Sequence, residues 1–202
     1  MSRIILCDVD DVLFKTIQAC SSRLKRETGY DMPFENFGPD WAATMDPEAY
    51  QYLDRVIFRD PSLYDDIEVI PGALEGIEGI RSMGDQVFLV TAGPPEAFGG
   101  KAAALRRLGF LDPDDLFCSD LMGVTRKDLI RGDVIIDDSL HNLIETRVPH
   151  RIMFDRPWNQ GVELAPTIAR AATWRGVAAH IKTISRGTPH QHAPTAGRAL
   201  VR

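Results

Sequence analysis

Carboxylate side chains cluster directly after a short apolar run near the start of the chain. Residues 4–7 are Ile-Ile-Leu-Cys, and Asp8, Asp10 and Asp11 follow them. A run of this kind is typical of a buried strand, and burying an ion costs several kcal/mol unless something compensates it. The cluster therefore indicates a bound cation, a chemical role, or both. The simpler alternative is an acidic loop after a core strand.

Three later segments carry polar or charged side chains that could act together with this cluster. Asp137 and Asp138 end a second apolar run, Thr91 ends a third, and Lys127 precedes Asp137 by ten residues. Taken singly each is a weak signal, because a Thr after a strand is usually a cap and a lone Lys is usually solvated. Since parallel strands end at one edge of a sheet, we expect these side chains to meet there.

Such a set of residues suits attack on a phosphate monoester. Carboxylates around a phosphate dianion repel by about 4 kcal/mol per pair of unit charges at roughly 4 Å. A divalent cation offsets this repulsion, and ligands that are all oxygen atoms favour Mg²⁺ over softer metals. The sequence therefore predicts a Mg²⁺ site at the carboxyl edge of a sheet.

The elements that would position these residues alternate between strand and helix. Strands are predicted at 4–7, 87–90, 116–119, 133–136 and 151–154, and helices at 16–28, 46–59, 71–83, 95–108 and 174–184. Strands that alternate with helices imply a parallel sheet covered on both sides, so the fold class is α/β and Rossmann-like.

An insert interrupts this alternation after the first strand. Residues 14–69 are far longer than an ordinary crossover, and we expect them to form a small helical cap over the carboxyl end of the sheet. Residues 1–13 and 70–185 would then form the core domain. The polar residues 186–202 lack periodicity and are expected to be a disordered tail.

Composition narrows the classes of partner and compartment. The net charge of −6 argues against a nucleic acid polymer as the partner. The apolar runs are too short to cross a membrane. The three cysteines are widely spaced, which indicates free thiols in a reducing compartment such as the cytoplasm. The oligomeric state stays open, with a homodimer among the possibilities.

The motifs in this order resemble the haloacid-dehalogenase superfamily of phosphohydrolases. Residues 8–13, Asp-Val-Asp-Asp-Val-Leu, are similar to the first motif of that superfamily. Thr91 is similar to the second motif, Lys127 to the third, and the pair Asp137-Asp138 to the fourth. The resemblance covers about residues 3–185, and the second Asp of the first motif favours phosphoryl chemistry over dehalogenation.

Within this superfamily the chain most resembles the cytosolic type C group of 5′(3′)-deoxyribonucleotidases. That group also carries a small helical cap, and its Pro-Gly-Ala helix entry looks like residues 71–73. Two positions depart from the group. Asp11 stands where relatives usually have Gly, and Ala92 stands where they have Ser, which bears on phosphate geometry and substrate choice.

The resemblance implies a role for each motif residue. Asp8 would be the nucleophile and a metal ligand, and Asp10 the general acid and base, with its backbone carbonyl on the metal. Thr91 and Lys127 would bind the phosphoryl oxygens. The remaining metal ligand would be an acid of the strand-end pair, preferably Asp138, with Asp137 supporting it or binding through water.

Specificity is expected to come from the cap. Trp41 and Phe58 lie near the positions where the deoxyribonucleotidases place aromatic residues against the base. The alternative is that both form the apolar core of the cap. The expected function is a Mg²⁺-dependent 5′-nucleotidase acting on (deoxy)nucleoside monophosphates through an aspartyl-phosphate.

Two other functions compete with this one. The first is a capped phosphatase for another small phosphomonoester, such as a sugar phosphate. The second is a non-catalytic protein that binds Mg²⁺ or phosphate, similar to a receiver domain. Receiver domains place the phosphorylated residue on a middle strand and lack a cap, whereas the acceptor here would lie on the first strand.

Overall fold

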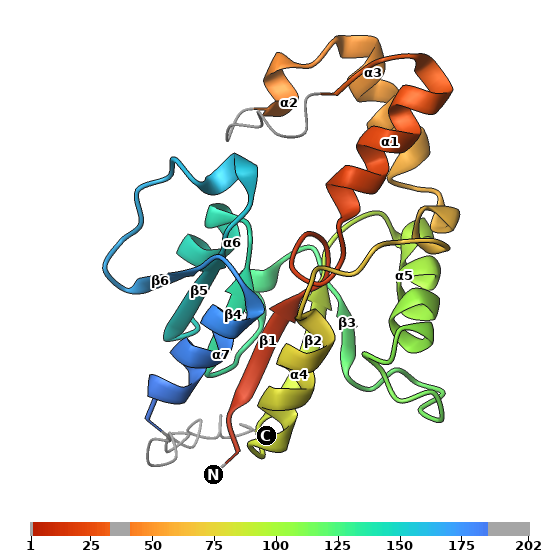
Figure 1. Cartoon of the computed structure of the whole chain (residues 1–202). Coiled ribbons are helices and arrows are strands. Elements are labelled where there is room, and N and C mark those ends of the chain that lie inside the picture. Colours follow the sequence, from red (N-terminus) through yellow and green to blue (C-terminus); the bar gives the residue numbers. More distant parts are fainter. Residues whose placement is uncertain (1, 33–40, 186–202) are drawn as a thin grey trace, which may run out of the picture.

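The first strand of the chain lies at the centre of the sheet. We describe a computed structural model over residues 2–32 and 41–185, with only the backbone of Trp41. Six parallel strands run in the order β3-β2-β1-β4-β5-β6 (Figure 1). The strands are β1 (Ile4–Asp8), β2 (Gln86–Thr91), β3 (Leu121–Gly123), β4 (Val134–Asp137), β5 (His150–Phe154) and β6 (Ile168–Ala171).

Helices cover both faces of this sheet. Successive residues of β1 point to opposite sides, and the apolar residues on each side pack against these helices. Ile5 and Cys7 enter a main apolar cluster with residues of α4, α5 and α7. Leu6 enters a second cluster that includes Leu143 of α6. The predicted α/β fold with a covered parallel sheet is confirmed. These helices are α4 (Ala73–Ser82), α5 (Pro95–Arg107), α6 (Leu140–Glu145) and α7 (Trp174–Thr183).

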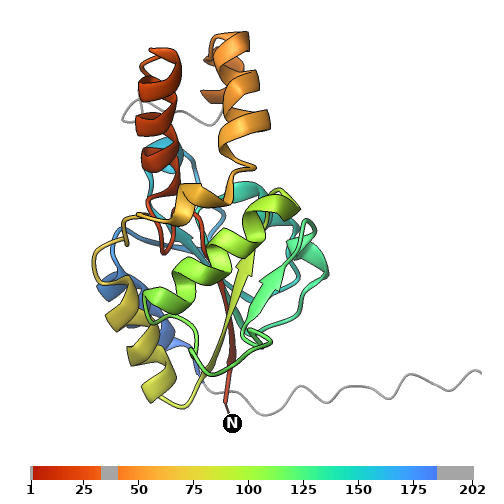
Figure 2. The same cartoon turned by 90° about the vertical axis from the view of Figure 1, so that its right-hand side faces the viewer.

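A helical insert connects β1 to α4 and stands beyond the carboxyl ends of the strands (Figure 2). Within it, α1 packs beside α3 and η2. This arrangement agrees with the cap expected after the first strand, while the domain boundaries at residues 14 and 69 remain a prediction. The insert contains α1 (Thr16–Thr28), α2 (Trp41–Thr44), α3 (Pro47–Tyr52), the π-helix η2 (Leu53–Ile57) and the 3₁₀-helix η3 (Pro61–Tyr64).

The returning end of the insert packs tightly against α5. A Cβ atom at Gly100 would lie 2.2 Å from the carbonyl oxygen of Pro61, so only glycine allows this approach. The ring of Phe14 lies 6.4 Å from that of Tyr64 and 5.9 Å from that of Phe110. These contacts tie both ends of the insert to the core.

Local signals explain where several helices begin and end. Gly29, with a φ of 79°, ends α1 in the left-handed conformation that glycine tolerates. The Asp46 carboxylate accepts hydrogen bonds from the backbone of Glu48 and Ala49, each at 3.0 Å, and so caps α3. Both boundaries were predicted and are confirmed. Among the described residues, no helix has both the length and the apolar character needed to span a bilayer.

The strand predicted at 116–119 is wrong, and β3 lies a few residues later at Leu121–Gly123. The Asp115 carboxylate accepts hydrogen bonds from the backbone of Phe117 and Ser119, which turns this segment away from an extended path. Phe117 is consequently 91% exposed. The short elements α6 and β6 were not predicted.

The packing of α4 against α7 yields a stability test within one helix. A Cβ at Gly76 would lie 2.4 Å from the Trp174 ring, whereas a Cβ at Gly79 would meet nothing within 4 Å. We expect Gly76→Ala to lower the free energy of unfolding by about 1–3 kcal/mol through overpacking. The control, Gly79→Ala, should raise it by about 0.5–1 kcal/mol. Urea unfolding measures both, and equal effects would contradict this packing.

Candidate active site

The ends of two adjacent strands bring Asp8 and Asp137 to either side of one lysine. Lys127 begins the 3₁₀-helix η4 (Lys127–Leu129), which follows β3. Its Nζ lies 2.7 Å from Oδ1 of Asp8 and 2.8 Å from Oδ2 of Asp137. All three side chains are buried. A single ammonium group therefore compensates two buried carboxylates.

Asp138 adds a third carboxylate to this group. Trp158, in the 3₁₀-helix η5 (Pro157–Asn159), donates its Nε1–H to Oδ2 of Asp138 at 2.8 Å. Asn159 donates to the Asp138 backbone oxygen, also at 2.8 Å. One carboxylate oxygen from each of Asp8, Asp137 and Asp138 lies within 4.8 Å of the others. The carboxylates of Asp8, Asp137 and Asp138 thus lie close together at the ends of two strands.

Burial and mutual repulsion shape the electrostatics of this acidic group. Burial, with the neighbouring carboxylates, raises the pKa of Asp8 and of Asp138 well above the usual range, although Lys127 opposes this at both. Burial alone would lower the pKa of Lys127, but the charges of Asp8 and Asp137 outweigh it and raise that pKa. One lysine is thus too little positive charge for the group, which fits an added cation.

The hydrogen bonds indicate which oxygens are available for a cation. Asp137 is fully buried, and both of its oxygens accept hydrogen bonds, from Lys127, Ser139 and Asn142. Within the described part of the chain, no donor reaches Oδ2 of Asp8 or Oδ1 of Asp138. Asp8 and Asp138 therefore each keep one oxygen available, and carboxylate oxygens suit a hard divalent cation.

Asp10 lies in a separate set of hydrogen bonds. Its Oδ1 accepts from Thr16 Oγ1 at 2.8 Å and from the Tyr64 hydroxyl at 3.1 Å. Its Oδ2 accepts from Thr91 Oγ1 at 3.2 Å and from Lys101 Nζ at 2.5 Å. Burial, followed by the charge of Asp10, raises the pKa of Tyr64, so its hydroxyl stays a donor. Four donors thus fix the orientation of one carboxylate.

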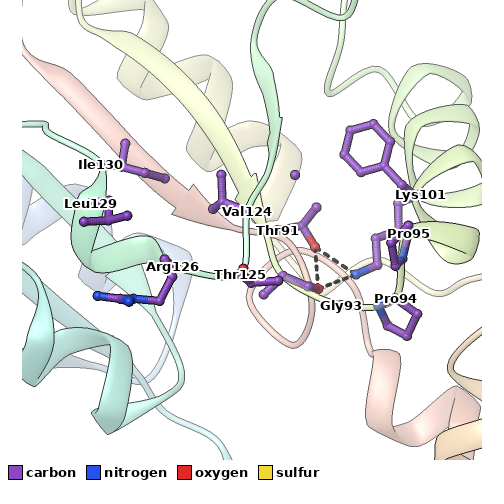
Figure 3. A pocket seen from close by; sticks show the side chains of 13 residues that line it. Thr91, Gly93, Pro94, Pro95, Lys101, Val124, Thr125, Arg126, Leu129 and Ile130 are labelled. Atoms are coloured by element: carbon purple, nitrogen blue, oxygen red, sulfur yellow. Dashed lines mark hydrogen bonds between the residues drawn. The ribbon is translucent and has the colours of Figure 1, made fainter.

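Lys101 is a site residue that sequence reasoning missed. Its Nζ also donates to Thr91 Oγ1 at 2.8 Å and to the Ala92 carbonyl at 3.0 Å (Figure 3). The residue is only 3% exposed. A signal was available, because Lys101 shares the helical face of Ala97, Ala104 and Leu105, all of which are buried. A charged residue at a core position of a helix indicates a buried partner.

The departure at Asp11 also has a structural explanation. Its φ of 56° is the left-handed conformation that glycine adopts freely and that Asp tolerates better than most residues. The buried carboxylate accepts from the backbone N–H of Ile17 at 3.3 Å and lies 3.7 Å from the Arg156 guanidinium. Burial raises its pKa to about 8, against the opposing charge of Arg156.

The two aromatic residues expected to bind substrate stay predictions. Phe58 follows η2, where it is half-buried and packs against the main apolar cluster. The side chain of Trp41 lies outside the described part of the structure. The motif residues are brought together as two neighbouring groups, one around Lys127 and one around Asp10.

The buried carboxyl of Asp11 makes a prediction about pH. Its folded pKa of about 8 exceeds that of an unfolded Asp, about 4, so the folded chain binds the extra proton between these values. The stability of the wild type therefore falls as the pH rises through this window. Asp11→Asn has no such loss. The free energy of unfolding of Asp11→Asn minus that of the wild type should therefore increase from about pH 4 to about pH 8.

Urea unfolding in metal-free buffer across this pH range measures that difference. Asp114→Asn is the control, because Asp114 is exposed and its variant removes the same single charge. A difference between wild type and Asp11→Asn that is constant with pH would show that Asp11 does not titrate on folding.

Comparisons with known proteins identify the family of the chain. The profile of the family described as 5′ nucleotidase, deoxy (pyrimidine), cytosolic type C protein matches residues 2–186. A protein of Chlorobaculum tepidum, provisionally named 5′(3′)-deoxyribonucleotidase, is 26% identical over 145 residues. The match covers 71% of this chain and 69% of that protein.

Solved structures confirm the fold. A haloacid-dehalogenase-like hydrolase from Xanthomonas campestris is similar with a TM-score of 0.53 at 15% identity, covering 90% of this chain and 95% of that one. A hydrolase from Pseudomonas syringae has a TM-score of 0.56 at 14% identity, covering 92% of this chain and all of the other. Identities this low bear on the fold alone.

The family profile spans nearly the whole chain. The chain therefore belongs to the cytosolic type C 5′-nucleotidase family and is a phosphohydrolase enzyme, and its fold is similar to that of haloacid-dehalogenase-like hydrolases.

Proposed function

We propose that the chain is a Mg²⁺-dependent 5′-nucleotidase that hydrolyses (deoxy)nucleoside monophosphates through an aspartyl-phosphate. The observation that carries this proposal is the meeting of Asp8, Asp138 and Lys127 at the end of the central strand. The family description and the name of the Chlorobaculum relative support a nucleotide as the substrate. A cytoplasmic location is part of the proposal, supported by the word cytosolic in the family description.

The reaction would begin with attack by the Asp8 carboxylate on the phosphorus atom, through the oxygen that does not hold the cation and in line with the ester oxygen. The new bond from Asp8 to phosphorus forms as the bond from phosphorus to the ester oxygen breaks. Asp10, oriented by its four neighbours and starting in its protonated form, would give its proton to the departing alkoxide. It would then take a proton from the water that cleaves the acyl-phosphate, which restores both carboxyl groups.

Fixed donors would stabilise the charge that develops on the phosphoryl group. Lys127 Nζ touches Asp8 directly, and Thr91 lies at the end of the adjacent β2, which supports the proposal that both donate to phosphoryl oxygens. Mg²⁺ held by the available oxygens of Asp8 and Asp138, and by the Asp10 carbonyl, would supply further positive charge to those oxygens.

Assays with purified protein against a panel of phosphomonoesters, with Mg²⁺ or with EDTA, test this proposal. We expect turnover of nucleoside monophosphates that EDTA abolishes and Mg²⁺ restores. Asp8→Asn should reduce turnover to background while its circular dichroism spectrum stays that of the wild type, because the nucleophile is lost and the fold is kept. Turnover by Asp8→Asn, with mass spectrometry excluding deamidation, would disprove the assignment of the nucleophile.

The contacts of Lys101 predict how the effect of its substitution on kcat depends on the leaving group of the substrate. Lys101→Met removes the ammonium that holds Asp10 and Thr91, so protonation of the leaving oxygen should suffer. We expect kcat for nucleoside monophosphates to fall by about a hundredfold. The fall should be much smaller for p-nitrophenyl phosphate, whose leaving group departs without protonation.

Steady-state kinetics with both substrates measure this contrast. Lys182→Met is the control, because Lys182 is exposed on α7. Equal losses for the two substrates in Lys101→Met would mean that the residue supports the fold rather than the position of the acid.

A further inference from the structure

The turn that follows β5 holds Asp138 at two points. Trp158 donates its Nε1–H to Oδ2 of Asp138 at 2.8 Å. The side-chain amide of Asn159 donates to the backbone carbonyl of Asp138 and to that of Phe154, both at 2.8 Å. Two neighbouring residues of one short turn thus bind both the carboxylate and the backbone of a single acid.

This turn is itself held in place by further contacts. Asn159 is buried, and its Oδ1 accepts a hydrogen bond from the backbone N–H of Arg156 at 3.0 Å. The guanidinium of Arg170 donates to the Asn159 carbonyl at 3.2 Å and pairs with Asp155. The guanidinium carbon of Arg156 lies 5.5 Å from the centre of the Trp158 ring. The indole therefore donates to Asp138 from a fixed support.

These donors leave one oxygen of each acid for a cation. Among the described residues, Trp158 is the donor to Oδ2 of Asp138, and Oδ1 stays available. At Asp8, Lys127 Nζ lies 2.7 Å from Oδ1, and the backbone N–H of Val9 donates to the same oxygen at 2.8 Å. Each of the two carboxylates is consequently arranged to bind an ion through a single oxygen.

Binding through one oxygen discriminates between two common divalent cations. Mg²⁺ is small and demands nearly octahedral geometry, whereas Ca²⁺ accepts about six to eight oxygen ligands and readily takes both oxygens of one carboxylate. A carboxylate that is free to turn both oxygens toward the ion therefore favours Ca²⁺. A carboxylate whose second oxygen is held by a donor favours Mg²⁺.

We propose that Trp158 is a positioning residue of the cation site, which restricts Asp138 to binding through one oxygen and so makes the site prefer Mg²⁺ to Ca²⁺. The inference rests on the proposed function, since it concerns the cation of the same site. Trp158 acts through Asp138 rather than on the substrate.

Two substitutions separate the N–H of Trp158 from the bulk of its ring. This separation matters because Trp158 also packs against the main apolar cluster, a structural role that depends on the ring. Trp158→Phe keeps an aromatic ring but has no donor. Trp158→His loses the six-membered ring but keeps a donor, because the Nε2 of an imidazole can take the position of the indole Nε1.

Tyr52→Phe is the matched control for the loss of an aromatic donor. The Tyr52 hydroxyl donates to Oε2 of Glu27 at 3.1 Å, within the insert. The substitution therefore removes the same kind of hydrogen bond from a carboxylate outside the proposed cation site.

Isothermal titration calorimetry on protein freed of metal, without substrate, gives the dissociation constants for Mg²⁺ and for Ca²⁺. At a pH of about 8 the introduced imidazole is neutral, since the ordinary pKa of His is about 6.5. We expect Trp158→Phe to weaken Mg²⁺ binding by about tenfold or more, because it removes a partner that orients a metal ligand. Binding of Ca²⁺ should change little, so the preference for Mg²⁺ falls. Trp158→His and Tyr52→Phe should keep the preference of the wild type.

The outcomes distinguish this inference from the proposed function. An unchanged preference in Trp158→Phe, in a protein that hydrolyses nucleotides with Mg²⁺, would overturn the inference and keep the function. Equal losses in Trp158→Phe and Trp158→His would also overturn the inference, because the ring would then matter rather than the donor. The expected change in preference, in a protein that hydrolyses no phosphomonoester, would keep the inference and overturn the function. If circular dichroism shows that Trp158→Phe does not fold, Trp158→Met, which also lacks the donor and has a more adaptable side chain, is the deciding variant.

Discussion

The arrangement depends on the burial of negative charge at the end of the central strand, and on two lysines that make this burial tolerable. Lys127 contacts Asp8 and Asp137, and Lys101 contacts Asp10. Each lysine is nearly inaccessible to water, so its charge acts in a medium of low dielectric where attraction over a few ångströms is strong. The rest of the fold holds these charged groups at the distances at which they interact.

Strand order explains why residues so far apart in the chain reach one point. β1 lies between β2 and β4, so the ends of three adjacent parallel strands carry Asp8, Thr91 and Asp137. The lysines come from the connections, Lys101 from a helix that packs on the sheet and Lys127 from the segment before β4. The strand ends thus carry the carboxylates Asp8 and Asp137, and the connecting elements carry the two lysines.

Much of this organisation could be predicted from residue types and spacing. Apolar runs that end in acids identified β1 and β4, and the overlong connection at 14–69 identified the insert. The strand expected at 116–119 failed because the Asp115 side chain, rather than a neighbouring strand, takes the backbone donors. The position of Lys101 follows from helical periodicity, but its partner Asp10 depends on tertiary packing that periodicity does not contain. Tyr64 was equally out of reach, since only the folded insert brings it to Asp10.

The close approach of Pro61 to Gly100 has a mechanical consequence. Pro61 begins the turn that ends in Tyr64, and Gly100 precedes Lys101, so the two sides of this contact each send one donor to Asp10. Because position 100 has no side chain, the backbones of η3 and α5 pack directly against each other. A tilt of the insert relative to the sheet would therefore act through this contact on the carboxylate of Asp10, and so on the geometry of the proposed acid.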